Sequence, residues 1–235
     1  MPATAYRAIV EQIDSLSYNV RGFRLKLVDP PALTFKAGQF IIMNVPQNGK
    51  TIKRAYSIAS APHEPHAIEL CVQKVEGGIA STYFWGLKEG HTVSVTGPHG
   101  NFLLKEPFDY DPVFIATGTG VAPLRSMIKH LIHTHITRDV WLLFGTRYEH
   151  SLLYESEFRA LANLRHNFHY VPTVSRPKDW HGETGHVQQT FQKHITDLSN
   201  KEIYLCGWLE VIKAVCQDLA GFGVPREKLH YEEWA

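Results

Sequence analysis

Hydrophobic and polar residues alternate one by one through much of the first hundred positions. Phe23, Leu25 and Leu27 are separated by charged residues, and the same period of two recurs over 68–73 and 92–96. Proline- and glycine-containing turns separate these segments. Short alternating strands at such spacing indicate an antiparallel barrel or sandwich. We expect an N-terminal antiparallel Greek-key β-barrel, with one short helix near residues 80–87.

A different pattern follows, in which continuous apolar runs alternate with helical periodicity. Val113–Ala116 is wholly apolar, and the next apolar positions, from Leu124 to Ile132, have helical spacing. Four later runs also read as strands: 140–144, 170–174, 203–206 and 228–231. The helices between them are expected through Leu152, Leu153, Phe158 and Leu161, over 187–194, and over 211–219. Apolar strands alternating with helices form a parallel sheet covered on both faces. We therefore predict a C-terminal doubly wound five-stranded parallel sheet.

A turn-rich stretch near residues 105–112 separates the two patterns. Its prolines and aspartates are typical of a connection rather than of a strand or helix. We predict a barrel domain over residues 1–108 and an α/β domain over residues 109–235. The sequence contains no internal repeat or low-complexity tract.

A glycine turn follows the first strand of the predicted parallel sheet. Gly118 and Gly120 precede a helix whose first turn holds Pro123, where the missing N–H costs nothing. Free N–H groups at such a helix start suit a pyrophosphate. The spacing departs from the G-x-G-x-x-G pattern, so a tight strand-to-helix turn without a ligand is the alternative.

Polar residues also follow the later strands of this sheet. Gly145-Thr146-Arg147 ends the second strand, Ser175-Arg176 the third, and Cys206-Gly207 the fourth. The carboxyl ends of parallel strands lie along one edge of a sheet, where ligands bind. Hydroxyl, guanidinium and thiol groups on one edge would suit a dinucleotide.

The barrel carries a second candidate site. Arg54-Ala55-Tyr56-Ser57 places a cation, an aromatic ring and a hydroxyl on one extended segment. Taken alone, such a triplet is interpreted first as structural, with Tyr56 as a barrel-wall aromatic and Arg54 as a solvated ion-pair partner. However, a glycine-led helix start over 77–82 offers N–H groups and hydroxyls to a phosphate, with Arg54 as the counter-charge.

In this order and at this distance, the Arg-x-Tyr-Ser and Gly-Thr-Gly-Val-Ala-Pro motifs resemble those of the ferredoxin–NADP reductase superfamily of flavoproteins. The resemblance runs from the segment 35–40 to the C-terminus. It implies that Tyr56 packs on the flavin ring, that Ser57 hydrogen-bonds near flavin N5, and that Arg54 helps to hold the pyrophosphate. The implied FAD-binding residues are Arg54, Ala55, Tyr56, Ser57, Cys71, Val72, Lys74, Gly77, Gly78, Ile79, Ala80, Ser81, Thr82, Thr119 and Trp234. The implied NAD(P)-binding residues are Gly118, Thr119, Gly120, Gly145, Thr146, Arg147, Ser175, Arg176, Cys206, Gly207 and Leu209.

The last six residues extend the resemblance. His230-Tyr-Glu-Glu-Trp-Ala235 is similar to the ending of plant-type reductases, with Trp234 in the place of a tyrosine and Ala235 one residue beyond it. By the same resemblance, Glu232 delivers a proton and Cys206 lies beside the nicotinamide. These two, with Ser57 and Trp234, form the expected catalytic set. We expect Trp234 to move aside for hydride transfer; a hydrophobic anchor for the tail is the alternative.

The choice of cofactors is only partly decided by the sequence. FAD is favoured over FMN because the Arg-x-Tyr-Ser segment is joined by a glycine–serine turn that suits a dinucleotide. Arg147 and Arg176 could clamp the 2′-phosphate of NADPH. However, the stretch 180–187 lacks the arginine–tyrosine pair of NADP-dependent members, and Glu149 lies near the place of a ribose-binding acid. NADH and NADPH therefore both remain open.

Composition excludes several other classes of protein and cofactor. A net charge of +1 argues against a nucleic-acid surface, and three cysteines are too few for an iron–sulfur cluster. No apolar run reaches the roughly 18 residues of a membrane span, and the N-terminus lacks the apolar core of a signal peptide. We expect a cytoplasmic monomer. His130, His133 and His135 lack a carboxylate or cysteine spaced to complete a metal shell, so no metal is expected.

The leading hypothesis is an FAD-dependent NAD(P)H oxidoreductase that passes electrons to an external carrier such as ferredoxin or flavodoxin. Reduction of free flavin, or of the terminal component of an oxygenase, is an alternative. A non-catalytic FAD-binding electron-transfer or nicotinamide-sensing subunit is a rival from another class. The cations that could dock an acidic carrier, or simply be solvated, are Arg24, Lys26, Lys36 and Lys53.

Overall fold

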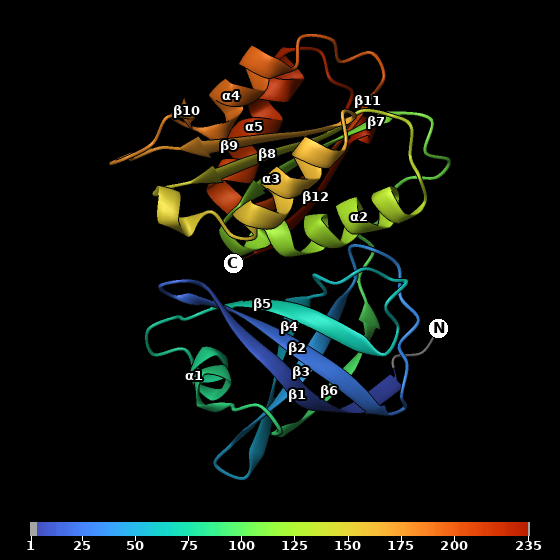
Figure 1. Cartoon of the computed structure of the whole chain (residues 1–235), viewed down its shortest axis with the longest axis vertical. Coiled ribbons are helices and arrows are strands. Elements are labelled where there is room, and N and C mark those ends of the chain that lie inside the picture. The colour runs from blue at the N-terminus through green and yellow to red at the C-terminus, as the bar shows by residue number, and fades with distance from the viewer. Residues whose placement is uncertain (1–3, 235) are drawn as a thin grey trace. The chain divides into compact units, whose positions relative to one another are not determined.

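The computed structural model describes residues 4–234, with side chains described through residue 233. The chain forms two compact units, each with its own sheet (Figure 1). Unit 1 comprises residues up to Leu104 together with Arg125–His133, and unit 2 comprises Lys105–Leu124 and the rest of the chain.

Unit 1 is built on an antiparallel sheet of six strands in the order β4-β3-β6-β1-β2-β5. The strands are β1 (Thr4–Ser17), β2 (Val20–Asp29), β3 (Phe40–Gln47), β4 (Lys50–Ser57), β5 (Ala67–Gln73) and β6 (Thr92–His99). An isolated bridge between Ile58 and Leu70 joins the end of β4 to β5, the two outermost strands of this order. The sheet thereby closes on itself, which confirms the expected barrel-like architecture.

The barrel core uses the alternate positions that the period of two predicted. Phe23, Leu25 and Leu27 on β2 are buried, as are Ile68, Leu70 and Val72 on β5. The predicted short helix is α1 (Ile79–Gly86), and its Phe84 packs edge-on against Phe23 with ring centroids 4.9 Å apart. This contact anchors the helix on the core.

Unit 2 is built on a parallel sheet in the order β10-β9-β8-β7-β11-β12. Its strands are β7 (Asp111–Thr117), β8 (Val140–Thr146), β9 (Phe168–Val174), β10 (Glu183–Thr184), β11 (Lys201–Trp208) and β12 (Leu229–Trp234). The five predicted strands are confirmed. The additional strand β10 has two residues and pairs with the end of β9, so it was too short to produce a periodic signal.

The helices that follow these strands are α2 (Val121–His133), α3 (Glu155–Leu164), α4 (Val187–His194) and α5 (Leu209–Gly221). The prediction that the second of them includes Leu152 and Leu153 is wrong. Tyr154 takes a left-handed conformation with φ of 56°, and α3 begins only after it. Glu155 and Glu157 in the first turn then complement the helix dipole.

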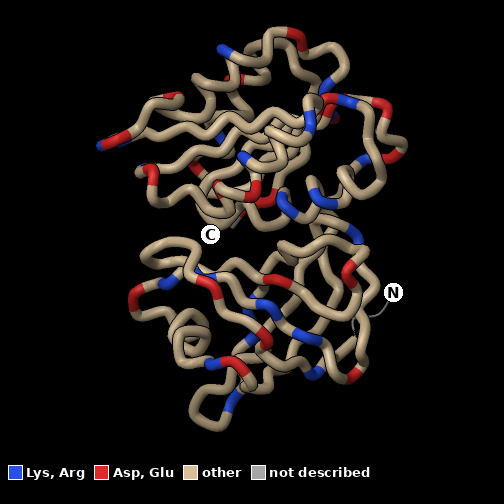
Figure 2. Tube along the Cα trace, viewed as in Figure 1, with Lys and Arg blue, Asp and Glu red and all other residues tan. Residues whose placement is uncertain are grey.

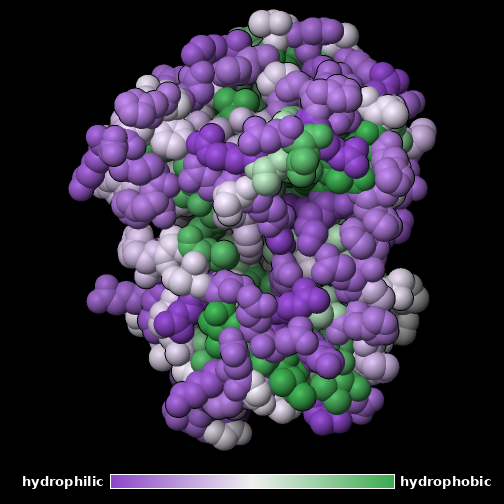
Figure 3. Space-filling model, in the orientation of Figure 1, coloured by the Kyte–Doolittle hydropathy of each residue, from purple (hydrophilic) through white to green (hydrophobic). Residues whose placement is uncertain are grey.

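Charged side chains are mixed in sign along both units. Figure 2 shows lysines and arginines interspersed with acids along the trace, in keeping with the net charge of +1. In the face drawn in Figure 3, hydrophilic residues cover most of the surface and hydrophobic areas are smaller and separate. No helix within the described residues is both long and apolar enough to cross a membrane.

Candidate cofactor-binding sites

The Arg54–Ser57 segment forms the end of β4 and pairs with β3, where Tyr56 lies opposite Ile41. Arg54 and Tyr56 are two residues apart and so project from the same face of the strand. Arg54 and Ala55 are exposed, Tyr56 is half-buried, and Ser57 is buried. The segment thus presents a solvated cation and part of an aromatic ring side by side.

Tyr56 is held by the core and keeps its proton. Its ring meets Phe84 edge-on at a centroid distance of 4.9 Å. Burial raises the pKa of Tyr56 to about 12, an effect that the nearby Arg54 charge only partly offsets. At neutral pH the side chain is therefore a neutral phenol, an apolar surface with one polar end.

The start of α1 leaves backbone N–H groups without a side-chain cap. Gly78 is the N-cap residue, and no side chain in the described chain caps this end. A Cβ at Gly78 would lie 2.8 Å from Ser81 Oγ, and Gly77 has φ of 69°, so this loop requires both glycines. Unsatisfied N–H groups at Ile79 and Ala80 suit a phosphate.

The hydroxyl of Ser81 stabilises the loop itself. Its Oγ accepts a hydrogen bond from the N–H of Val75 at 3.1 Å and lies 3.1 Å from the carbonyls of Val75 and Gly78. Because the hydroxyl is engaged in the loop, only the backbone N–H of Ser81 would bind a phosphate. The Thr82 side chain is exposed, whereas its N–H is bonded to the carbonyl of Gly78.

The three residues implied for the adenosine half differ in what they can offer. Val72 is 1% exposed and belongs to the core, so only its backbone can face a ligand. Cys71 is buried on the same strand. The Lys74 ammonium lies over the Trp85 ring, 5.4 Å from its centroid, and shares that ring with the Arg21 guanidinium. Lys74 is thereby held close to α1.

Sequence reasoning missed the groups that hold the chain just after Ser57. Arg125 is only 8% exposed, and its Nη1 donates to the carbonyl of Ala59 at 2.8 Å and to Glu69 Oε2 at 2.6 Å. Ser126 Oγ donates to the carbonyl of Ser60 at 2.6 Å, and Ser60 Oγ accepts from the Glu69 N–H. The sequence did contain one signal for this role, because Arg125 is a cation among the apolar positions of α2.

Burial of Glu69 is compensated by these cations. Burial alone would raise the pKa of the carboxyl, but attraction and hydrogen bonding to Arg125, with a contribution from Lys129, hold it below its ordinary value. Arg24 contacts the other oxygen of Glu69 at 2.9 Å and also contacts Glu11 and Glu64. Arg24, expected as a docking cation, is therefore already surrounded by carboxylates.

The carboxyl edge of the parallel sheet is packed so closely that it requires glycine. A Cβ at Gly120 would collide with the carbonyl of Cys206, and a Cβ at Gly207 would collide with Thr117 Oγ1. Gly118 has φ of 54° and starts a single 3₁₀ turn, Gly118–Gly120, that leads into α2. The glycine turn is thus locked against the end of β11, with half-buried Thr119 at its centre.

Pairing between β8 and β9 continues past the ends of both strands. The N–H of Ser175 donates to the carbonyl of Thr146 at 2.9 Å, and the N–H of Arg176 donates to the carbonyl of Arg147 at 2.8 Å. Two exposed arginines therefore lie next to each other at this edge. Gly145, two residues before Arg147, is also closely packed, since a Cβ there would be 3.1 Å from Val187 Cβ.

Glu149, the acid noted near the second strand, serves the following loop. Its Oε1 accepts a hydrogen bond from the N–H of Asp179 at 3.4 Å. Backbone hydrogen bonds, first its own and then those of Asp179 and Lys178, lower the pKa of Glu149. One carboxylate oxygen thus helps to hold the loop, whereas Oε2 is buried without a hydrogen-bond partner among the described residues.

The last strand continues the same edge. In β12, Glu232 pairs in register with Cys206 of β11, and Trp234 pairs with Trp208. Cys206 is buried, whereas Glu232 and Leu209 are half-buried. The Trp234 side chain and all of Ala235 lie outside the described residues, so the movement of Trp234 stays a prediction. Trp208 was not among the predicted site residues, although it lies between Gly207 and Leu209 of the implied NAD(P)-binding set.

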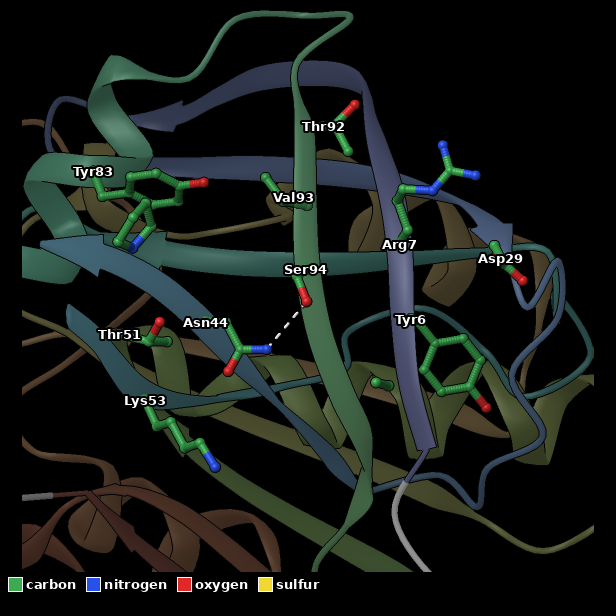
Figure 4. A pocket seen from close by; sticks show the side chains of 12 residues that line it. Tyr6, Arg7, Asp29, Asn44, Thr51, Lys53, Tyr83, Thr92, Val93 and Ser94 are labelled. Atoms are coloured by element: carbon green, nitrogen blue, oxygen red, sulfur yellow. Dashed lines mark hydrogen bonds between the residues drawn. The ribbon is translucent and has the colours of Figure 1, made fainter. Parts of the chain in front are cut away.

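Two other features lie apart from these residues. An open groove of about 920 Å³ on unit 1 is lined mainly by polar residues of β1, β3, β4 and β6 (Figure 4). Lys53, one of the possible docking cations, lines it, and Asn44 donates to Ser94 within it at 3.1 Å. His133 stacks on His63 with ring centroids 3.8 Å apart. Within the described residues, no three metal-binding side chains are grouped to hold an ion.

Comparison with known proteins decides the family. Residues 7–103 match the oxidoreductase FAD-binding domain model, and residues 114–217 match the oxidoreductase NAD-binding domain model. The chain is 35% identical over 240 residues to ferredoxin--NADP reductase B of Sorangium cellulosum, covering 99% of this chain and 98% of that relative. This chain belongs to the ferredoxin–NADP reductase superfamily. The prediction from the two motifs is confirmed.

Some other members of the superfamily are longer than this chain. The phenol hydroxylase P5 protein of Acinetobacter pittii is 35% identical over 207 residues, which cover 86% of this chain and 58% of that protein. The crystal structure of a cytochrome P450 reductase from Amycolatopsis superposes with a TM-score of 0.91 at 29% identity, covering 99% of this chain and 70% of the other. The chain is accordingly an oxidoreductase with an FAD-binding and an NAD(P)-binding domain.

Proposed function

We propose that this superfamily member oxidises NAD(P)H through FAD and delivers electrons to ferredoxin or flavodoxin. The observation that carries the proposal is the presence in one chain of the Arg54–Ser57 segment beside the uncapped start of α1, and of a glycine-locked carboxyl edge in the parallel sheet. The chain is similar to a ferredoxin--NADP reductase over 98% of that relative's length, which supports ferredoxin as the electron carrier. Residues 1–108 would hold FAD and residues 109–235 the nicotinamide dinucleotide.

The residues present fit an FAD. Backbone N–H groups of Ile79 and Ala80 and the exposed Arg54 provide the positive surface that a pyrophosphate needs. The neutral Tyr56 ring provides an apolar surface next to Arg54. When bound, FAD accepts two electrons as hydride and releases them one at a time. Ser57 is proposed to donate a hydrogen bond at the flavin, and Glu232 and Cys206 to serve proton delivery and nicotinamide placement.

Anaerobic mixing with NADH or NADPH tests the proposal. We expect the purified yellow protein to lose its flavin absorbance promptly, and then to regain it when oxidised ferredoxin or flavodoxin is added. Rapid re-oxidation by free riboflavin alone would favour a flavin reductase. If ferredoxin, flavodoxin and free riboflavin all fail to re-oxidise the flavin, the protein would instead be an oxygenase reductase component. Similarity to the phenol hydroxylase P5 protein supports this alternative. A protein that stays yellow would support the non-catalytic alternative.

Gel filtration of the same preparation tests the expected monomer, and cell fractionation tests the expected cytoplasmic location.

We further propose that the adjacent Arg147 and Arg176 bind the 2′-phosphate of NADPH. Replacing both with alanine should raise the KM for NADPH at least about tenfold, because a hydrogen bond to a charged group contributes about 1.5–3 kcal/mol. The KM for NADH should change less than about twofold. Steady-state reduction of an artificial acceptor measures both values. Arg138→Ala is the matched control, since Arg138 is exposed and precedes β8 at the opposite edge of the sheet. Equal losses for both donors would show that the arginines do not select the phosphate.

A further inference from the structure

Trp208 is an exposed aromatic residue at the edge of the sheet where ligands bind. Its side chain is 59% exposed, in contrast to the preceding six residues of β11, which are all buried. It is the last residue of that strand and the N-cap of α5. Ligands of open parallel sheets bind at the carboxyl ends of the strands. The indole is therefore placed where a dinucleotide would lie.

The indole lies next to the glycine turn. A Cβ built at Gly118 would be 3.7 Å from Trp208 Nε1, an ordinary van der Waals distance. Any side chain at position 118 would thus extend toward the space that the indole occupies. Gly118 also has a positive φ of 54°, a conformation that favours glycine, so position 118 presents only backbone atoms to the indole.

The backbone that carries the indole is fixed from two sides. The N–H of Trp208 donates to Thr117 Oγ1 at 3.2 Å, and the preceding Gly207 has φ of 152° and lies against Thr117. On the other side, Trp208 pairs in register with Trp234 of β12. The backbone therefore needs no rearrangement for the indole to meet a ligand, which lowers the cost of binding.

The order of the strands assigns Trp208 to one half of the dinucleotide. The glycine turn follows β7, with β8 and β9 on one side and β11 on the other (Figure 1). The adjacent arginines follow β8 and β9, where the phosphate of the adenosine half is proposed to bind. A dinucleotide whose pyrophosphate lies at the glycine turn therefore places its nicotinamide toward β11 and Trp208.

We propose that the Trp208 indole contacts the nicotinamide ring of bound NAD(P) and binds the oxidised form more tightly than the reduced form. The preference follows from charge, because oxidised nicotinamide is a cation and reduced nicotinamide is neutral. An indole face attracts a cation through its quadrupole. Trp208 would thus set how firmly the oxidised product is retained. The inference rests on the proposed function, since it requires a nicotinamide dinucleotide at this edge.

Equilibrium titrations of the FAD-loaded protein test this assignment. The probes are NADP⁺, tetrahydro-NADPH, and 2′-phospho-ADP-ribose. Tetrahydro-NADPH is a non-reducing analogue whose nicotinamide ring is uncharged, and 2′-phospho-ADP-ribose lacks nicotinamide. Trp208→Ala should raise the Kd for NADP⁺ about fivefold or more, within the range of a cation–π contact with tryptophan. The Kd for the uncharged analogue should rise less, and that for phospho-ADP-ribose should change less than about twofold. Trp208→Phe should restore part of the NADP⁺ affinity.

Phe222→Ala is the matched control, because Phe222 is a 48% exposed aromatic at the other end of α5. It should leave all three Kd values unchanged. Equal weakening of phospho-ADP-ribose and NADP⁺ by Trp208→Ala would overturn the assignment to nicotinamide. An unchanged Kd for NADP⁺, or equal weakening of NADP⁺ and the uncharged analogue, would overturn the preference for the cation. Failure of the wild-type protein to bleach with either NADH or NADPH would instead reject the proposed function.

Discussion

Replacing Gly120 with alanine should lower the rate of flavin reduction by NADPH at least about a hundredfold while leaving FAD bound. The added Cβ would collide with the carbonyl of Cys206 and lie 2.6 Å from the N–H nitrogen of Gly207, so β11 and the glycine turn must separate. Both atoms are backbone, and neither can rotate away. A displacement of about 1 Å at a reacting centre can cost about a hundredfold in rate.

Stopped-flow mixing with NADPH measures this loss, and the flavin-to-protein absorbance ratio reports retained FAD. Gly221→Ala is the control in the same unit. Gly221 ends α5 without a positive φ, and a Cβ added there would meet no atom within 4 Å among the described residues. Its replacement should leave the rate unchanged and stabilise the helix slightly. Normal reduction by the Gly120 variant would mean that the turn has room the structure does not show.

Replacing Arg125 with methionine should lower the free energy of unfolding by about 3 kcal/mol. Removing one member of a buried ion pair costs about 3–5 kcal/mol because the other charge is left in a poor environment. The lower end applies here, since Arg24 still contacts the second oxygen of Glu69. The carbonyl of Ala59 also loses its donor. Because Ala59 follows closely on Ser57, we expect weaker FAD binding as well.

Urea denaturation of the apoprotein measures the stability, and fluorescence of released flavin measures the binding. Arg159→Met is the matched control, because Arg159 forms an i,i+4 pair with Glu155 while half exposed. Such pairs contribute about 0.3–0.5 kcal/mol. Adding Glu69→Gln to the Arg125 variant should restore part of the loss by removing the uncompensated carboxylate. If the double variant were less stable still, the charge of Glu69 would not be the cause.

The same ion pair predicts a dependence on pH. The pKa of Glu69 is lower in the folded protein than its ordinary value near 4.5. The unfolded chain therefore takes up a proton first as the pH falls. The stabilising contribution is fully present above pH 4.5 and is lost as the pH falls toward the folded pKa. In the Arg125 variant this acid-sensitive part should shrink, which the same denaturation repeated between neutral and acid pH will show.

Both sheets could be predicted from the sequence because burial imposes a regular spacing on the apolar residues. On β2, Phe23, Leu25 and Leu27 enter the core while the residues between them face outward. On β7, Val113, Phe114 and Ile115 are all buried because helices cover both faces. Local signals of this kind need no knowledge of distant residues. The two-residue β10 has no such pattern, since it is defined by its pairing with β9, and the left-handed conformation of Tyr154 is a single-residue feature without a period.

The candidate sites divide in the same way. Arg54, Tyr56, Ser57 and the Gly118–Gly120 turn could be recognised because contiguous residues form each motif. Arg125 could not be assigned, since its partners Ala59 and Glu69 lie more than fifty positions away. The engagement of the Ser81 hydroxyl and of Glu149 by nearby loops was equally hidden.

The sequence by itself determined the two-part architecture and the superfamily, and it supplied the prediction of which two segments meet the cofactors. It could do so because periodic burial and short motifs each depend on residues that are close together in the sequence. Only the tertiary structure decided that Gly120 must be glycine, that Arg125 supports the chain after Ser57, and that Trp208 lies beside the glycine turn. Each of these depends on a contact between segments far apart in the chain, and such contacts exist only once the sheets have formed.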